Sequence, residues 1–133
     1  MKLAKRQKIG ALGEDLAAKY LQNKGFSVIS RNYRKKCGEI DIIAKNRGIL
    51  HFVEVKSVSC ENLLDNVSRE TSGHRPEDNI HEGKLRRLAR TIQVYLAERC
   101  LGREPEWQFD AITVKIDENT KQAKVKFIED IIL

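Results

Sequence analysis

The sequence predicts an α/β protein with a central mixed β-sheet flanked by helices, in the element order α-β-β-β-α-β-β. Two observations lead to this fold class. Apolar residues recur at helical spacing in two separate segments, and short runs rich in β-branched and aromatic residues lie between and after them. A chain of 133 residues has the size of one domain and can bury enough surface to fold without disulfides. We therefore expect a single domain over residues 1–133.

Two helices are predicted. The first covers about residues 7–24, where apolar side chains repeat at helical spacing and Gly25 follows as a C-cap. Glu14 lies at the margin of its apolar stripe and points toward whatever the helix packs on. The second helix covers about residues 80–100. Lys and Arg crowd its first turns, where positive charge opposes the helix dipole unless an anion lies nearby.

Five strands are predicted from runs of strand-forming residues bounded by turn residues. They cover about residues 26–33, 39–44, 50–57, 107–116 and 123–132. The sequence Asn46-Arg47-Gly48 is typical of a turn, so the second and third strands should form an antiparallel hairpin. Residues 58–79 are polar and have no clear period, and we expect a long irregular loop there.

Charge is distributed unevenly along the chain, whose net charge is +6. Residues 1–36 hold ten Lys or Arg and two Asp or Glu, and residues 84–103 hold six and one. These basic segments flank an acidic middle. Basic clusters attract polyanions, and nucleic acid is the commonest polyanion in the cytosol. A solvated basic face without a partner would have the same composition, and charge alone does not separate the two interpretations.

Composition also bears on the compartment. No apolar run approaches the roughly 18 residues that a membrane span needs, so no membrane association is expected. The three cysteines are widely spaced and odd in number, which indicates free thiols in a reducing compartment. We therefore expect a cytoplasmic protein.

The hairpin carries two carboxylates whose relation depends on its register. Alternation places Glu54 and Lys56 on one face of the third strand. If a four-residue loop pairs Lys45 with Leu50, Asp41 lies across from Glu54 with Cβ atoms about 5 Å apart. A three-residue loop separates the two carboxylates instead, unless a bulge intervenes. The sequence leaves both registers open.

Facing carboxylates on a half-buried hairpin repel each other, and a divalent cation between them would reverse the sign of that interaction. Mg²⁺ takes oxygen ligands and typically uses one or two protein carboxylates together with waters and substrate phosphate. Lys56 could orient an attacking water or offset charge on a phosphate, and Glu14 could be a third carboxylate. Cross-strand ion pairs on a solvated face are the alternative interpretation, and the spacing by itself favours that alternative.

The same residues resemble a known nuclease motif. Asp41 followed by Glu54-Val55-Lys56 on the next strand is similar to the PD-(D/E)xK motif of restriction-endonuclease-like nucleases, although Ile40 stands where the motif often has Pro. The segments GEDLAAKYLQNKGF, RNYR, GEIDIIA, FVEVKS and FDAITV, in this order, resemble the bacterial YraN family. That family is grouped with Holliday-junction-resolvase-like endonucleases. The match covers about residues 8–57 closely and 84–116 more loosely.

This resemblance implies a restriction-endonuclease-like three-layer fold and a set of site residues. It implies that Asp41 and Glu54 bind Mg²⁺ or Mn²⁺, that Glu14 assists them, and that Lys56 is a catalytic lysine. The segment 58–83 looks longer than the usual connection of the family, so its contacts cannot be carried over.

We further predict contacts with the nucleic-acid backbone from the two basic segments, with one tyrosine able to stack on a base. The residues are Arg31, Tyr33, Arg34, Lys35, Lys36, Lys84, Arg86, Arg87 and Arg90. The function expected is metal-dependent hydrolysis of structured or branched DNA, with DNA a more suitable partner than RNA. A nucleic-acid-binding module or a repair-complex scaffold that keeps the fold without cleavage is the alternative. Paired incision of a junction would need two sites, which makes a homodimer attractive.

Overall fold

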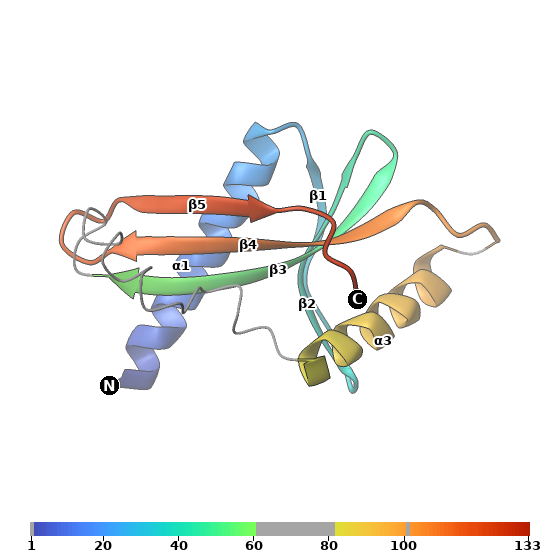
Figure 1. Cartoon of the computed structure of the whole chain (residues 1–133), viewed down its shortest axis with the longest axis horizontal. Helices are drawn as coiled ribbons and strands as arrows, with labels where there is room; N and C mark the ends of the chain where they lie inside the picture. Colours follow the sequence, from blue (N-terminus) through green and yellow to red (C-terminus); the bar gives the residue numbers. More distant parts are fainter. Residues whose placement is uncertain (1, 61–81, 101) are drawn as a thin grey trace.

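The computed structural model describes residues 2–60, 82–100 and 102–133 of the chain. Its elements follow the predicted order, helix, three strands, helix, two strands (Figure 1). They are α1 (Lys2–Asn23), β1 (Ser27–Lys35), β2 (Gly38–Asn46), β3 (Ile49–Cys60), α3 (Glu82–Arg99), β4 (Trp107–Asp117) and β5 (Ala123–Ile128). Within the described residues, no helix has the length and hydropathy needed to cross a membrane.

The five strands form one mixed sheet in the order β1-β2-β3-β4-β5. Only β3 and β4 are parallel, and they pair along their whole lengths, from Leu50 opposite Trp107 to Cys60 opposite Asp117. The other neighbouring pairs are antiparallel. A parallel pair needs a crossover connection, and α3 lies in the segment that makes it.

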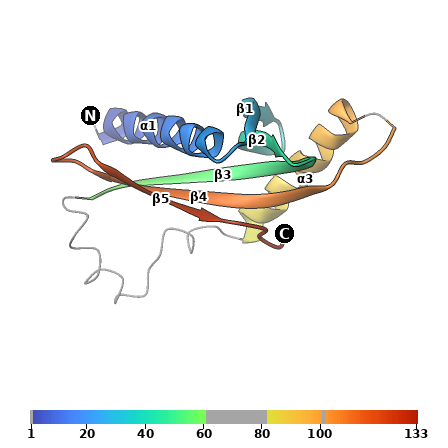
Figure 2. The ribbon, with the colours of Figure 1, turned by 90° about the horizontal axis from the view of Figure 1, so that it is seen from above.

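Helices α1 and α3 cover opposite faces of the sheet. Ala17 and Leu21 of α1 are fully buried in one cluster with Val53, which points to one face of β3. Ile92 of α3 is buried in a second cluster with Phe52, which points to the opposite face. Figure 2 shows α1 lying along one side of β3, β4 and β5. The resulting helix–sheet–helix layering confirms the predicted restriction-endonuclease-like three-layer fold.

The β1–β2 hairpin changes direction at Asn32, which has a φ of 56° in the middle of β1. Asn tolerates this left-handed conformation better than most residues. Arg31, just before Asn32, contacts α1. Tyr33, just after it, packs against Tyr95 of α3, with the ring centroids 5.2 Å apart. The hairpin therefore contacts the helices on both faces of the sheet, and in Figure 1 it bends away from the direction of β3–β5.

The structure corrects several predicted boundaries. Helix α1 begins near residue 2 rather than 7, because the residues there are mostly good helix formers although they show no apolar period. Residues 58–60, predicted as the start of the loop, extend β3 because β4 pairs with them. The remainder of the predicted loop, residues 61–79, lies outside the described residues. Strand β5 ends at Ile128 rather than at residue 132.

A buried polar cluster explains why β5 ends early. The carboxylate of Asp110 is fully buried, and its Oδ2 lies 2.6 Å from Nδ1 of His51 on β3. Its Oδ1 accepts hydrogen bonds from the side-chain amide of Gln108 and from the backbone N–H of Asp130, both at 2.8 Å. The backbone N–H of Ile131 donates to the carbonyl of Phe109. These bonds turn the C-terminal segment away from strand geometry and onto β4.

Candidate functional site

The β2–β3 hairpin has the register that brings the two carboxylates together. Lys45 pairs with Leu50 and Ile42 with Val53, as in the four-residue-loop alternative. Pairing continues to Asn46 and Ile49, so the turn itself is the two residues Arg47 and Gly48, with φ values of 53° and 81°. Two consecutive positive φ angles are typical of the hairpin turn whose twist matches that of the strands.

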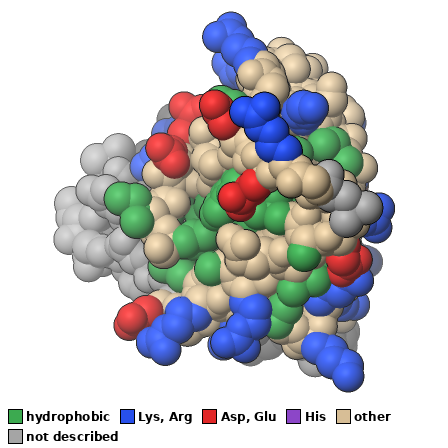
Figure 3. Space-filling model, turned by 90° about the vertical axis from the view of Figure 1, so that its right-hand side faces the viewer, with side chains coloured by type: hydrophobic (Ala, Val, Ile, Leu, Met, Phe, Trp, Pro, Cys, Tyr) green, Lys and Arg blue, Asp and Glu red, His purple; other side chains and the backbone are tan. Residues whose placement is uncertain are grey.

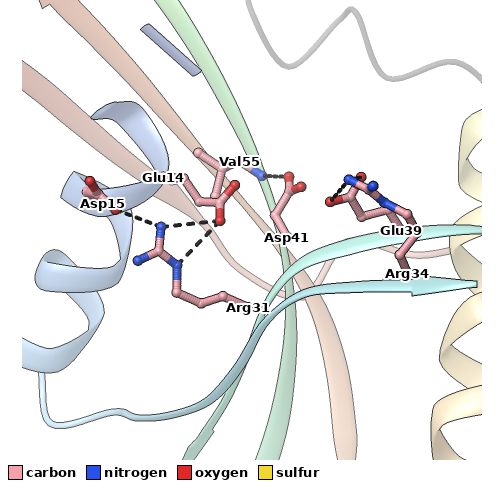
Figure 4. Close-up of polar contacts among 7 residues, drawn as sticks. All are labelled: Glu14, Asp15, Arg31, Arg34, Glu39, Asp41 and Val55. Atoms are coloured by element: carbon pink, nitrogen blue, oxygen red, sulfur yellow. Dashed lines mark hydrogen bonds and ion pairs between the residues drawn. The ribbon is translucent and has the colours of Figure 1, made fainter. Parts of the chain in front are cut away.

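Asp41 lies where β2 and β3 separate. Backbone pairing stops at Ile42 and Val53, and the next backbone donor of β3, the N–H of Val55, donates to Asp41 Oδ2 at 2.8 Å (Figure 4). The side chain of Asp41 therefore accepts the hydrogen bond that a backbone carbonyl of β2 would accept if the two strands were still paired. Beyond this point the β2-facing edge of β3 borders a cleft, since Val55, Lys56 and Ser57 all line it.

Burial raises the pKa of Asp41 to about 8, with the neighbouring Glu54 charge as the second cause. Glu14 raises this pKa further, and the hydrogen bond from Val55 opposes the increase. A carboxyl group that resists ionisation at neutral pH lacks a sufficient positive charge beside it.

Glu54 is only 6 % exposed, and its carboxylate is paired with the ammonium group of Lys84, which lies in the first turn of α3. Lys56, two residues further along β3, is half-buried and lines the same cleft as Asp41 and Glu54. It makes no ion pair with any carboxylate of the described residues, so its ammonium is available to a ligand in the cleft.

Glu14 reaches the cleft from α1 because the helix approaches β3 closely at Gly13. A Cβ atom on Gly13 would lie 1.7 Å from Oγ and 2.7 Å from Cβ of Ser57. Glu14 is paired with Arg31 of β1, whose Nε and Nη2 both lie 3.3 Å from Glu14 Oε1 (Figure 4). Nη2 of Arg31 also lies 2.7 Å from Asp15 Oδ1. The hydrogen bond with Asp15, followed by that with Glu14, raises the pKa of Arg31.

Replacing Gly13 with Ala is expected to destabilise the protein by about 1–3 kcal/mol, because α1 must move away from Ser57. Gly10→Ala is the matched control on the same helix, since nothing lies within 4 Å of a Cβ there. Ala has the higher helix propensity, so this control should be neutral or more stable by up to about 1 kcal/mol. Urea unfolding measures both. Equal midpoints for the two variants would contradict the close helix–strand contact.

The carboxylate pair lies between two adjoining cavities. The larger, of about 830 Å³, opens toward α1 and is lined by Lys5, Ile9, Gly10, Glu14, Asn32, Glu39, Asp41, Glu54, Val55, Lys56, Ser57, Val58, Ser59 and Lys84. The smaller, of about 400 Å³, lies toward α3 and is lined by Gly38, Glu39, Asp41, Glu54, Lys84, Arg87 and Leu88. A ligand at Asp41 and Glu54 can therefore extend to either side of them.

Comparison with known proteins assigns the chain to a family. The model of the uncharacterised protein family UPF0102 matches residues 13–114, which is most of the chain. The chain belongs to the UPF0102 family. A UPF0102 protein of Campylobacter fetus is 36 % identical over 122 residues, covering 92 % of this chain and 91 % of that protein. One from Syntrophotalea carbinolica is 39 % identical over 111 residues, covering 83 % and 80 %. The resemblance to the YraN family is thereby confirmed.

The span matched by the UPF0102 model contains all four predicted catalytic residues, and they line one cleft. They are Glu14, Asp41, Glu54 and Lys56. Among the residues that the structure describes, no three His, Cys, Asp or Glu side chains are grouped closely enough to hold a metal by themselves. Asp41 and Glu54 could supply two carboxylate ligands, the number that Mg²⁺ typically takes from protein when water and substrate complete its shell.

The residues of this UPF0102 protein predicted to contact nucleic acid fall into two groups. Some are engaged within the protein: Arg31 as described, Arg34 with Glu39, Lys35 with Glu98, Lys84 with Glu54, and Arg86 with Glu82. Tyr33 is buried, and its hydroxyl donates to Glu98 at 3.1 Å. Lys36, Arg87 and Arg90 are exposed. On the face shown in Figure 3, Lys and Arg side chains are dispersed around the rim and form no single patch.

Two partners in the UPF0102 site were missed by the sequence interpretation. Lys84 and Arg31 were assigned to nucleic acid, whereas the structure pairs them with the predicted site carboxylates Glu54 and Glu14. A signal for Lys84 was present, because a cation in the first turn of a helix opposes the helix dipole and is favoured there when an anion lies nearby. For Arg31 the sequence contains no comparable signal.

Proposed function

We propose that this UPF0102 protein is a metal-dependent endonuclease that hydrolyses the phosphodiester backbone of structured or branched DNA. The observation that carries the proposal is the pair of neighbouring carboxylates Asp41 and Glu54. They lie at the half-buried fork, the point where β2 and β3 separate, and Lys56 lines the same cleft. Adjacent buried carboxylates are unfavourable unless a cation neutralises them. The raised pKa of Asp41, caused first by burial and then by the charge of Glu54, is in line with that cost.

Asp41 and Glu54 would hold Mg²⁺ or Mn²⁺, and Glu14 would assist from α1 by orienting water. Bound there, the ion would supply neutralisation of charge on the phosphoryl oxygens. Lys56 would donate a hydrogen bond to the attacking water or to a phosphate oxygen as charge develops. Hydrolysis adds water across one P–O bond, so no further reactant is needed.

The cavities on either side of Asp41 and Glu54 would take the backbone flanking the scissile phosphate. Lys36, Arg87 and Arg90 are exposed and remain available for phosphate contacts, which position DNA without reading its sequence. Paired incision of a four-way junction would require a homodimer, because the described part of one chain offers one such site. Free thiols at Cys37, Cys60 and Cys100 fit a cytoplasmic protein.

A DNA-binding module without cleavage is the second candidate, and one observation favours it. Glu54 and Glu14 are each paired with a cation of the protein itself, Lys84 and Arg31. Such pairing would stabilise the cleft in the permanent absence of a metal.

A panel of substrates separates the two candidates. We expect the wild-type protein with Mg²⁺ or Mn²⁺ to cut a four-way junction or a flap in preference to linear duplex or single-stranded DNA. Glu54→Gln should abolish cutting and retain binding, because it keeps the shape of the side chain and removes a metal-binding charge. Binding that falls steeply with salt, without cutting of any substrate by the wild type, would favour the binding module.

A further inference from the structure

Lys84 enters the candidate metal site from α3, about thirty residues along the chain from the carboxylate it contacts. Its ammonium is paired with Glu54, and its side chain lines both cavities that meet at Asp41 and Glu54. The Glu54 side chain is 8 % exposed, whereas that of Lys84 is 39 % exposed. One partner is therefore fixed within the sheet, and the other can move into the cleft without unfolding anything.

The buried carboxylate of Glu54 is stabilised by a counter-ion, and the ammonium group of Lys84 provides it. A buried carboxylate without a counter-ion is strongly destabilising. The neighbouring Asp41 is another carboxyl group and provides no positive charge, and Lys56 forms no ion pair with Glu54 within the described part of the chain. The position of Lys84 is itself electrostatically unfavourable, because an ammonium in the first turn of a helix opposes the helix dipole.

We propose that Lys84 is a displaceable counter-ion, which a divalent cation must remove from Glu54 and which thereby sets the metal concentration at which the site fills. The inference rests on the proposed metal-dependent function. The ammonium and a divalent ion would compete for the same carboxylate group, so each would oppose binding of the other. Once displaced, Lys84 remains in the cleft with its charge free for a phosphate group, so that metal and phosphodiester favour each other's binding.

Calorimetric titration of the full-length protein with Mn²⁺, without DNA and at fixed pH and ionic strength, tests the proposal. We expect Lys84→Gln to bind Mn²⁺ roughly tenfold more tightly than the wild type, the usual scale of coupling between two sites. Lys84→Arg keeps the charge and should bind like the wild type. Lys19→Gln, which removes an exposed charge from α1 outside the cleft, should do the same.

Thermal unfolding gives a second readout that does not depend on activity. In metal-free buffer Lys84→Gln should melt below the wild type, because Glu54 loses its counter-ion, and saturating Mn²⁺ should remove the difference. Mn²⁺ binding by Lys84→Gln that is equal to or weaker than that of the wild type overturns the role of Lys84 and leaves the metal site standing. Absence of Mn²⁺ uptake by every variant up to millimolar concentration overturns the proposed function, and this inference with it.

Discussion

Replacing Lys56 with Ala is expected to lower the rate of DNA cleavage by roughly 10²–10³-fold, the usual cost of losing one donor that stabilises charge in the transition state. The ammonium of Lys56 lines the cleft beside Asp41 and Glu54 and makes no ion pair within the described residues. Its loss should therefore affect the reaction more than the fold. Single-turnover cleavage of a labelled junction, with enzyme in excess, measures the effect on the chemical step.

Lys45→Ala is the matched control, because Lys45 is an exposed lysine of the same hairpin and does not line the cleft. We expect its cleavage rate and its melting temperature to equal those of the wild type. DNA affinity measured in Ca²⁺ should change little in Lys56→Ala. A variant that loses affinity in proportion to its loss of rate would place Lys56 among the backbone contacts and exclude the assigned role in the reaction.

Replacing Asp41 with Asn is expected to alter how stability depends on pH. Burial and the charge of Glu54 raise the pKa of Asp41 from 3.8 to about 8 in the folded protein. Between these two values the folded state holds a proton on Asp41 that the unfolded state has released, so the contribution of Asp41 to the free energy of unfolding falls as pH rises from about 4 to about 8. Asn has no such proton. Its amide can still accept from Val55 N–H and can donate to Glu54, so the mutant should gain relative stability across this range.

Metal should reverse the ranking of the two proteins. Mg²⁺ at a hundredfold excess over its dissociation constant would stabilise the wild type by about 2.7 kcal/mol, whereas Asp41→Asn has lost one of the two ligands and should gain little. Melting curves from pH 5 to pH 9, with and without Mg²⁺, measure both effects. Parallel pH profiles of the two proteins, or an equal response to metal, would remove Asp41 from the site.

Much of the fold is predictable because its patterns are local. Helical spacing in α1 and α3 and alternation in β3 identify these elements correctly, and their order confirms the α/β class. Two of the boundary errors fall at strand ends that distant contacts determine. Strand β3 extends to Cys60 because β4 pairs with it, and β5 stops at Ile128 because Asp110 and Phe109 bind the backbone that follows. The local sequence at each of these strand ends contains no signal for the distant contact that determines it.

The hairpin shows the same division within the candidate site. The sequence locates Asp41, Glu54 and Lys56 on adjacent strands but permits two registers, which differ in whether the carboxylates meet. The two-residue turn Arg47-Gly48, with both φ angles positive, selects one of them. A one-residue change in register moves a side chain to the other face, so a small difference in turn geometry decides whether a site exists.

By itself, then, the sequence determined the element order, the residue types of the site and the basic character of the two flanking segments. Only the tertiary structure decided how those charges are used. Lys84 and Arg31, expected at nucleic acid, are paired with Glu54 and Glu14. The reason is physical, because a carboxylate removed from water binds the nearest available cation, and which cation is nearest depends on how α1, β1 and α3 pack around the fork between β2 and β3.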